Sequence, residues 1–532
     1  MTKIKMRPPV SATLAPMGRT WSAEIARLEE REAQARAAGG EERLAAQRRA
    51  GKLTARERVE ALLDPGSFVE LGMFAEHQCR DFGMAEKRYP GDGVIAGYGA
   101  IAGRSVYVYS EDATVLGGST GRVHGTKIHN VLRQARSHGV PVIGLHDSGG
   151  ARIQEGMDNV YGMTGVFREN VLASGEVPQI VGVMGTCAGG AAYSAALADF
   201  VVQVEKSSHL FVTGPAMVEE VHGERIGAEA LGGAEVHRTR SGVTHLVARD
   251  DRHCLALIRE LLDYLPQSHR EPAARKSTAD APDRPVPELE SIVPLDPDAG
   301  YDMRAVVRAI ADERRFLEIQ AGFAPNLVAG FARLGGRPVG IVANNPEALG
   351  GRIDLDAADK ASRFARTCDA FNIPIVTLAD SPGFLPGVAQ EHAGLVRHGA
   401  KMLHAWVETS APKVSVVLRK MYGGAIPAMG VHEIGFDRVF AWPTAEMQMV
   451  PAVPAVKILC RRELEAAPAP DELLARKIAE YRELYLSPYH SASLLVVDAV
   501  IRPQDTRKAL TSALRLLEGK SRPRRKRSNP PQ

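Results

Sequence analysis

The sequence predicts an α/β protein made of two copies of one domain. Two observations carry this prediction. Glycine, proline and aspartate residues recur at a fixed offset of 233 positions, and strand-like runs alternate with helix-like runs inside each copy. The length of 532 residues is also too great for a single compact core.

The repeat can be followed residue by residue. The matched pairs are Gly97 and Gly330, Gly103 and Gly336, Gly117-Gly118 and Gly350-Gly351, Pro141 and Pro374, and Asp147-Ser148 and Asp380-Ser381. After one inserted residue, Gly189-Gly190 matches Gly423-Gly424. These residue types mark turns and special backbone angles, so their shared offset indicates a duplication.

The chain is expected to begin with a disordered extension over residues 1–20, where prolines break any helix. Residues 21–50 are charged and alanine-rich, and they predict helices interrupted at Gly39-Gly40. Thr54 and Glu57 have the spacing of a capping box, which predicts the start of another helix.

Each copy then continues with one series of elements. In the first copy, residues 94–110 predict a β-hairpin, which leads through Gly117-Gly118 into a helix over 124–139 and a buried strand over 141–148. A further strand over 178–185 ends in a glycine-rich turn that opens a helix over 187–198.

These patterns divide the chain into an N-terminal domain over 21–270 and a C-terminal domain over 299–520. Residues 271–298 are rich in proline and predict a linker. Residues 521–532 form a basic tail, for which we expect a solvated, disordered end.

Composition excludes several classes of function. The 66 basic residues nearly balance the 63 acidic ones, so no global field favours nucleic acid or a membrane surface. The five cysteines form no C-x-x-C pair, which argues against a zinc ribbon and a secreted disulfide framework. Without an apolar run long enough to span a bilayer, we expect a soluble, cytoplasmic protein of bacterial type, with the mitochondrial matrix as the alternative.

The most informative feature is the pair of strand-to-helix junctions at Gly189-Gly190 and Gly423-Gly424-Ala425. Glycine lets a ligand oxygen approach the backbone, and the first N–H groups of a helix are unpaired and point outward. Such a junction can form an oxyanion hole. Close packing of helix on strand explains a single Gly-Gly turn equally well, but two junctions at equivalent repeat positions favour function.

Rival motifs are weaker. His146-Asp147-Ser148 has the residue types of a catalytic triad, but adjacent residues on a strand point to opposite faces and cannot form a relay. Gly97, Gly99 and Gly103 lie within a hairpin, which is the wrong context for a dinucleotide fingerprint. The sequence contains neither a P-loop nor an H-E-x-x-H motif, and we expect no metal.

Long motifs give the chain a recognisable family. It resembles the carboxyltransferase (β) subunits of biotin-dependent acyl-CoA carboxylases, of the propionyl-CoA carboxylase type, from about residue 21 to 520. The matching stretches include YPGDGVIAGYG, HDSGGARIQEG, MGTCAGGAAYS, DAADKASRFARTCDAFNIP and RKMYGGA. The resemblance implies a duplicated crotonase-type (ClpP/crotonase) ββα spiral, in agreement with the repeat.

The resemblance also implies site residues. Gly189 and Gly190 would hold the thioester oxygen of an acyl-CoA, and Gly424 and Ala425 the ureido oxygen of biotin. The wider acyl-CoA site would comprise Gly117, Gly118, Ser119, Arg152, Ile426 and Pro427. The biotin site would comprise Gly423, Gly424, Ala425, Met449 and Val450. Arg122, Lys127 and Arg152 are candidates for binding the CoA phosphates because they lie near glycine-rich loops, although a solvated face also explains each one.

In this family, biotin arrives on a partner protein, and the active site lies between the N-terminal half of one subunit and the C-terminal half of another. The resemblance therefore implies a homo-oligomer, usually a hexamer, and a biotin carboxylase or biotin carboxyl carrier partner. The proton on the α-carbon would be removed by biotin itself, so no side-chain base is required.

The sequence departs from the family on the biotin side. Pro427 replaces an acidic residue associated with acyl-group choice, and Pro451 and Pro454 lie in a segment, 449–456, where glycines are usual. Two alternatives therefore stay open beside carboxylation of a short or unusual acyl-CoA. One is an acyl-CoA decarboxylase subunit, and the other is a non-catalytic acyl-CoA-binding paralogue that assembles with active subunits.

Overall fold

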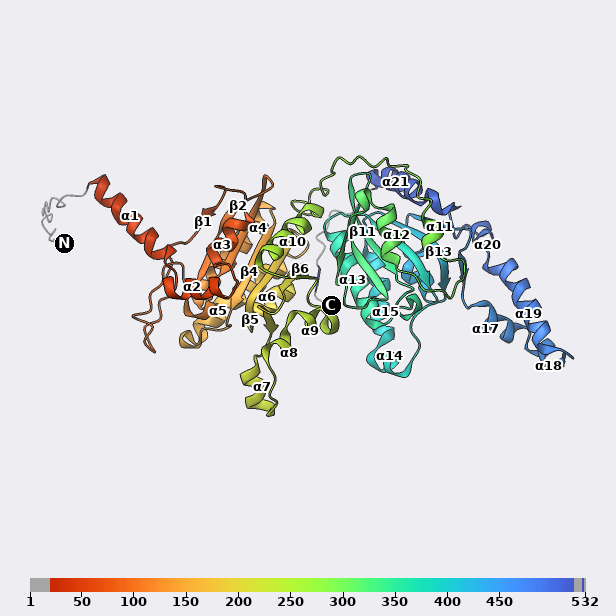
Figure 1. Ribbon diagram of the computed structural model, residues 1–532, viewed down its shortest axis with the longest axis horizontal. Helices are drawn as coiled ribbons and strands as arrows, with labels where there is room; N and C mark the ends of the chain where they lie inside the picture. The colour runs from red at the N-terminus through yellow and green to blue at the C-terminus, as the bar shows by residue number, and fades with distance from the viewer. Residues whose placement is uncertain (1–19, 521–528, 531–532) are drawn as a thin grey trace, which may run out of the picture.

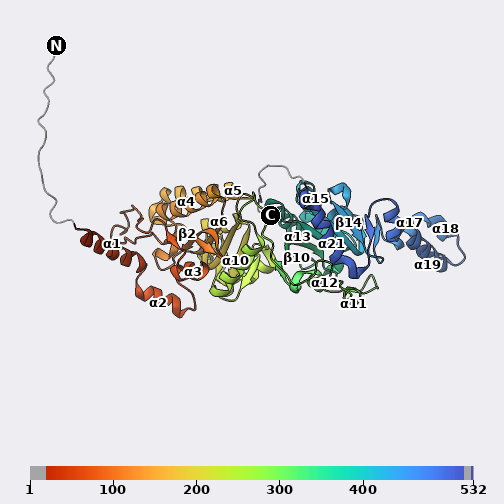
Figure 2. The same cartoon turned by 90° about the horizontal axis from the view of Figure 1, so that it is seen from above.

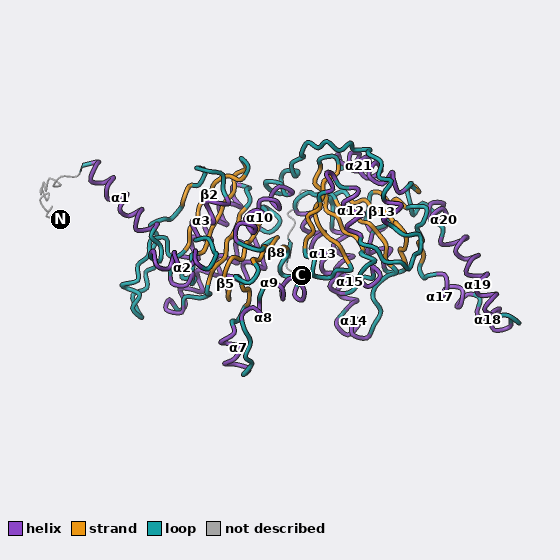
Figure 3. The backbone as a smooth tube through the Cα atoms, viewed as in Figure 1, coloured by secondary structure: helices purple, strands orange, loops and turns teal. Residues whose placement is uncertain are grey.

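The computed structural model describes residues 20–520 and 529–530. Two mixed sheets of eight strands each lie side by side along the long axis of the molecule, one in each half of the chain (Figure 1). Figure 3 shows the strands gathered into two groups that a long loop connects. The predicted α/β class and the duplication are confirmed.

Helices at the start of the chain follow the predicted pattern. α1 (Trp21–Arg36) and α2 (Glu41–Arg49) are separated at Gly39-Gly40, and α3 (Ala55–Leu62) follows. Thr54 and Glu57 form the predicted capping box, in which each side chain accepts a hydrogen bond from the backbone N–H of the other residue. The predicted extension over 1–20 lies, apart from Thr20, outside the described residues.

The first sheet has the strand order β1-β2-β3-β4-β5-β6-β8, with β7 paired to β5. Strands β1 to β3 are antiparallel, and the later neighbours are parallel. The strands are β1 (Val69–Glu70), β2 (Val94–Ile101), β3 (Arg104–Glu111), β4 (Val142–Ser148), β5 (Gln179–Ala188), β6 (Phe200–Val204), β7 (His209–Phe211) and β8 (Leu246–Ala248). The helices of this half are α4 (Arg122–His138), α5 (Met157–Ala173), α6 (Gly190–Leu197), α7 (Pro215–His222), α8 (Ala228–Gly232), α9 (Ala234–Val236) and α10 (Asp251–Tyr264).

The second sheet repeats the same plan, with the order β9-β10-β11-β12-β13-β14-β16 and β15 paired to β13. Its strands are β9 (Phe316–Ile319), β10 (Leu327–Leu334), β11 (Arg337–Asn344), β12 (Ile375–Ser381), β13 (Lys413–Tyr422), β14 (Arg438–Ala441), β15 (Glu446–Gln448) and β16 (Ala499–Val500). Its helices include α12 (Met303–Ile310), α13 (Leu355–Ala370), α14 (Val388–Ala393), α15 (Leu395–Glu408), α16 (Ala425–Met429) and α21 (Thr506–Leu516). Helices α17 (Ala452–Leu459), α18 (Arg461–Ala466) and α19 (Pro470–Tyr481) extend from one end of the molecule, opposite α1 (Figure 2).

The segment between the halves is packed, although it contains little regular structure. Its only helix is the short α11 (Leu289–Ile292). Val286 and Leu289 are buried in the core of the second half, and the Val286 N–H donates to the Gln504 carbonyl. The proline-rich stretch therefore forms part of the surface of the second half, and its fixed prolines limit the entropy lost on folding.

Residue Asn529 departs from the expectation of a solvated tail. It is 1% exposed and lies between the two halves. Its backbone N–H donates to the Ser174 hydroxyl, and its side-chain amide donates to Asp199 at 3.0 Å and to Thr367 at 2.8 Å. Arg363 of α13 donates to the Asn529 carbonyl. Composition alone does not reveal such a contact, because the four specific partners of one residue outweigh the solvation of a polar side chain.

We predict that Asn529→Ala lowers the free energy of unfolding by about 2 kcal/mol, because Asp199 and Thr367 lose a buried donor. Asn529→Asp keeps the shape but faces Asp199 with a second carboxylate, and its loss should be at least as large. Thermal melts of the full chain measure both. Melting temperatures equal to that of the wild type in both variants would contradict the assignment.

Candidate active site

The first junction lies where β5 gives way to α6. Gly189 has a φ of 59°, and its N–H donates to the Phe211 carbonyl of β7 at 3.1 Å. The N–H groups of Gly190 and Ala191 begin the helix and have no acceptor among the described residues. A Cβ on Gly190 would lie 2.6 Å from the Met163 side chain.

The second junction, between β13 and α16, repeats this arrangement. Gly423 has a φ of 52°, and its N–H donates to the Gln448 carbonyl of β15 at 3.0 Å. The N–H groups of Gly424 and Ala425 have no acceptor in the described part of the chain. A Cβ on Gly424 would lie 2.6 Å from the Phe384 ring.

The two junctions differ from the resemblance-based expectation by one residue in the first half. The sequence predicted Gly189 and Gly190 as donors there, but the Gly189 amide is already bound to β7. Gly190 and Ala191 occupy the positions that Gly424 and Ala425 occupy in the second half. The described geometry thus leaves one equivalent pair of amides available at each junction.

The Gly117-Gly118 loop lies against the end of β4. Gly149 donates its N–H to the Gly117 carbonyl at 3.0 Å, and the Ser148 hydroxyl donates to the Gly118 carbonyl at 2.7 Å. A Cβ on Gly118, whose φ is 65°, would lie 2.2 Å from the Asp147 carbonyl. Only glycine fits there.

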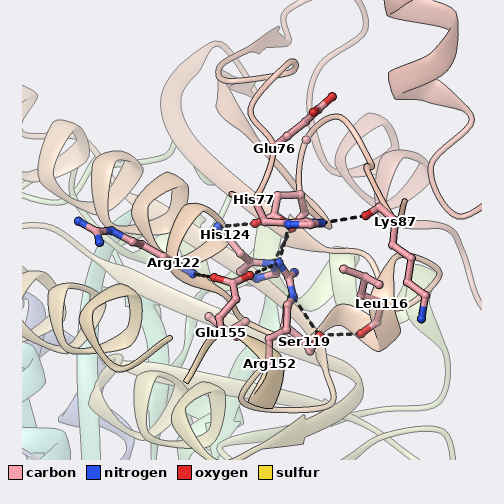
Figure 4. Close-up of polar contacts among 12 residues, drawn as sticks. Glu76, His77, Lys87, Leu116, Ser119, Arg122, His124, Arg152 and Glu155 are labelled. Carbon is pink, nitrogen blue, oxygen red and sulfur yellow. Dashed lines mark hydrogen bonds and ion pairs between the residues drawn. The ribbon is translucent and has the colours of Figure 1, made fainter. Parts of the chain in front are cut away.

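Arg152 lies beneath this loop and is buried (Figure 4). Its guanidinium donates to the Ser119 carbonyl at 2.7 Å, to Asp92 at 2.7 Å and to Glu155 at 2.8 Å. A second bond reaches the Ser119 hydroxyl at 3.3 Å. These bonds engage Nε and both terminal nitrogens of the guanidinium and fix the position of Ser119.

Arg122 and Lys127 differ in what they can offer to a phosphate. The Arg122 side chain is exposed and pairs with Asp158 at 2.7 Å. Lys127 is buried, burial lowers its pKa to about 8, and its ammonium donates to the Gly91 and Val94 carbonyls.

Lys127 has an equivalent residue in the second half of the chain. Lys360, at the same offset of 233, donates to the carbonyls of Ala324 and Leu327, which correspond to Gly91 and Val94. Because each half places a buried lysine in the same carbonyl cage, Lys127 is explained by the repeated fold.

The proline-containing segment is accommodated by helix starts. Pro451 immediately precedes α17, and Pro454 lies in its first turn, where backbone N–H groups have no intrahelical partner. Met449 and Val450 are exposed, and the Met449 carbonyl lies 3.0 Å from where a Gly423 Cβ would be. The segment therefore borders the second junction.

Ile426 and Pro427 belong to the first turn of α16, directly after Gly424 and Ala425. Pro427 removes no intrahelical bond at this position, and Ala428 makes the first regular bond, to the Gly424 carbonyl at 3.3 Å. The family's acidic residue is therefore replaced without breaking the helix.

His146, Asp147 and Ser148 point to different partners, as predicted for neighbours on a strand. Asp147 pairs with Lys52 and Arg58, whereas His146 lies beside Glu111. The sequence did not predict the buried partners of His146, because Glu111 and Tyr109 come from another strand, β3. The available signal was the presence of ionisable residues within segments that the sequence predicts to be buried.

A cavity of about 400 Å³ at the seam of the two halves is a rival location for a ligand. None of its lining residues belongs to either junction. Two of its cations, Lys276 and Arg333, already pair with Asp263 inside it. The described residues show no cluster of His, Cys, Asp and Glu able to hold a metal ion, and none of their helices is both long and apolar enough to cross a bilayer.

A family model described as the carboxyl transferase domain matches residues 46–530. The chain belongs to the carboxyl transferase family. It is 47% identical over 497 residues to the propionyl-CoA carboxylase beta chain of Roseobacter denitrificans, covering 93% of this chain and 97% of that one. It is also 46% identical to the methylmalonyl-CoA decarboxylase subunit alpha of Veillonella parvula, covering 93% and 96%.

A solved carboxyl transferase has the same architecture. The structure of transcarboxylase 12S, described as a hexamer with methylmalonyl-CoA and methylmalonic acid bound, superposes with a TM-score of 0.94 at 46% identity, covering 97% of this chain and 99% of that one. The family and the enzyme class predicted from the motifs are confirmed, as is the fold class.

We predict that Gly190→Pro lowers kcat at least about 100-fold, because it removes one candidate oxyanion donor. Proline is tolerated at the first position of a helix, so α6 should persist. Gly190→Ala is the matched control, since it adds the same Cβ against Met163 but keeps the N–H. Steady-state kinetics compare the two, and equal activity of both variants would contradict the role of this amide.

Proposed function

We propose that this chain is the carboxyltransferase subunit of an acyl-CoA carboxylase, and that it places a carboxyl group on the α-carbon of a short or unusual acyl-CoA. The observation that carries the proposal is the pair of equivalent junctions with available amides, Gly190 and Ala191 in one half and Gly424 and Ala425 in the other. None of these residues has a titratable side chain, so the chain contributes backbone donors to the reaction.

At the first junction, the Gly190 and Ala191 amides would receive the thioester oxygen of the acyl-CoA. When the α-proton leaves, negative charge develops on that oxygen, and fixed N–H dipoles stabilise it without reorganisation. Each donor of this kind contributes about 3 kcal/mol to transition-state stabilisation. The enolate carbon then forms the new C–C bond to the incoming carboxyl carbon.

The second junction would receive the ureido group of biotin, because the Gly424 and Ala425 N–H groups have no acceptor among the described residues and the Phe384 ring packs where a Gly424 side chain would lie. Gly424 and Ala425 would hold the ureido oxygen, with Met449 and Val450 at the edge of the site. Biotin carried by a partner protein supplies the carboxyl group and the base for the α-proton when it is bound.

Assembly is part of the proposal. Apolar side chains near the first junction are exposed in the single chain, among them Met157 and Tyr161 of α5. Others are exposed in the second half, among them Val396 of α15 and Ile458 of α17. A homo-oligomer that places the N-terminal half of one subunit against the C-terminal half of another would cover both, and a hexamer as described for transcarboxylase 12S is the form we propose.

One specific observation supports a second candidate, decarboxylation. The decarboxylase subunit and the carboxylase beta chain are 46% and 47% identical to this chain, so overall similarity does not separate the two directions. The same junctions would serve either direction, because the enolate is common to both.

The test combines the purified chain with a biotinylated carboxylase partner, ATP, bicarbonate and a panel of acyl-CoAs. We expect ATP-dependent carboxylation of at least one short acyl-CoA. Carboxyl transfer only from methylmalonyl-CoA to the carrier would favour the decarboxylase. Acyl-CoA binding without transfer in either direction would overturn the proposal in favour of a non-catalytic paralogue.

Pro427 gives a prediction about acyl-group choice. Because it replaces an acidic residue in the first turn of α16, Pro427→Asp should shift kcat/KM toward propionyl-CoA over longer acyl-CoAs by about tenfold, a change of about 1.4 kcal/mol. Pro427→Ala is the control for loss of the ring. If Pro427→Asp leaves the ratio of kcat/KM for propionyl-CoA to that for longer acyl-CoAs unchanged, Pro427 does not lie in the acyl pocket.

A further inference from the structure

A buried charged cluster lies behind the Gly117–Ser119 loop. Glu111, the last residue of β3, lies between two histidines, His124 of α4 at 3.3 Å and His146 of β4 at 3.1 Å. The ring of His146 also lies 3.0 Å from the Tyr109 hydroxyl. All four side chains are almost completely buried.

The two histidines favour the carboxylate form of Glu111. Burial alone would raise the pKa of Glu111, but the two histidines outweigh it and lower the pKa to about 2. The two ring nitrogens of His124 face the Asp92 carbonyl and the Glu111 carboxylate, which only accept hydrogen bonds. His124 therefore links Asp92 and Glu111 through its two ring nitrogens.

The cluster is connected to the loop through Asp92 and Arg152. Asp92 accepts from the backbone N–H of His124 at 2.9 Å and from Arg152 at 2.7 Å. Arg152 in turn holds Ser119, as Figure 4 shows, and Glu155 accepts from the Arg122 N–H at 2.7 Å. Asp92 has a φ of 49°, which is a strained value for a residue other than glycine.

The second half has the same fold but lacks this charged cluster. The register is fixed by equivalent backbone bonds, from Arg152 to Thr120 and from Leu385 to Ile353. The counterparts of Asp92, Tyr109, Glu111, His124, His146 and Arg152 are Pro325, Val342, Asn344, Ala357, Ala379 and Leu385. Not one of these six counterparts can carry a charge.

Nor does the loop need the cluster for its backbone shape. Leu116 and Leu349 both have a φ of 50°, and the two glycines that follow are left-handed in both halves. Helix α13 is capped by its own Asp354, whereas the first turn of α4 depends on the distant Asp92 and Glu155. Buried charges are expensive to maintain, so their presence in only one half calls for a reason beyond folding.

We propose that Glu111, His124 and Arg152 are positioning residues that hold Ser119 and the first turn of α4 for the acyl-CoA bound in the N-terminal half. This inference rests on the proposed function, since it assigns the acyl-CoA to that half. The residues act through Ser119 and through the α4 amides, and they make no contact with the reacting atoms.

The test uses Glu111→Gln, which keeps the shape of the side chain and removes the charge that holds His124. In the reconstituted holoenzyme we expect the KM for propionyl-CoA to rise about tenfold, while kcat and the KM for the biotinylated partner change less than about threefold. Calorimetry with propionyl-CoA should show the same loss of affinity. Glu111→Asp retains the charge and should recover part of it.

Two further variants separate positioning from folding. Arg152→Lys keeps the buried charge but loses the planar guanidinium that reaches Ser119, Asp92 and Glu155. It should also raise the KM for propionyl-CoA, and it provides the test if Glu111→Gln proves insoluble. Asp147→Asn removes a buried carboxylate that both halves share as Asp147 and Asp380. It should lower the melting temperature and leave the KM for propionyl-CoA within about twofold.

An unchanged KM and binding constant for propionyl-CoA in folded Glu111→Gln and Arg152→Lys would overturn the positioning role. The proposed function would then still stand. Failure of the wild-type chain to bind any acyl-CoA of the panel would instead overturn both.

Discussion

One backbone hydrogen bond, made twice, determines the geometry of both candidate sites. Gly189 donates to Phe211 and Gly423 donates to Gln448, and each bond ties a left-handed glycine to a neighbouring strand. At each junction this hydrogen bond ends the strand and turns the chain, so that the next two amides lie at a helix start and point outward. Any residue with a side chain would be strained at these φ values, so both junctions require glycine at this position.

The duplicated fold lets one half serve as a control for the other. Features found in both halves, such as the carbonyl cages of Lys127 and Lys360, belong to the architecture. Features found in one half indicate what that half does. The charged cluster around Glu111 marks the first half, and the prolines of α16 and α17 mark the second.

Much of this fold could be predicted from the sequence, because glycine and proline spacing reflects backbone angles directly. The capping box at Thr54, both glycine junctions and the repeat follow from local chemistry. The pairing of the Gly189 amide could not be predicted, since its acceptor comes from a later strand. The burial of Asn529 and the link from Glu111 to Ser119 likewise depend on residues that only the folded chain brings together.

We propose that backbone amides at the β5–α6 junction bind the reacting oxygen. The decisive measurement is a crystal structure of the wild-type assembly with a CoA thioester bound. We expect the thioester oxygen at about 3 Å from the Gly190 nitrogen, with the Gly189 amide still bound to Phe211. A thioester oxygen held by a side chain, or bound away from this junction, would contradict it.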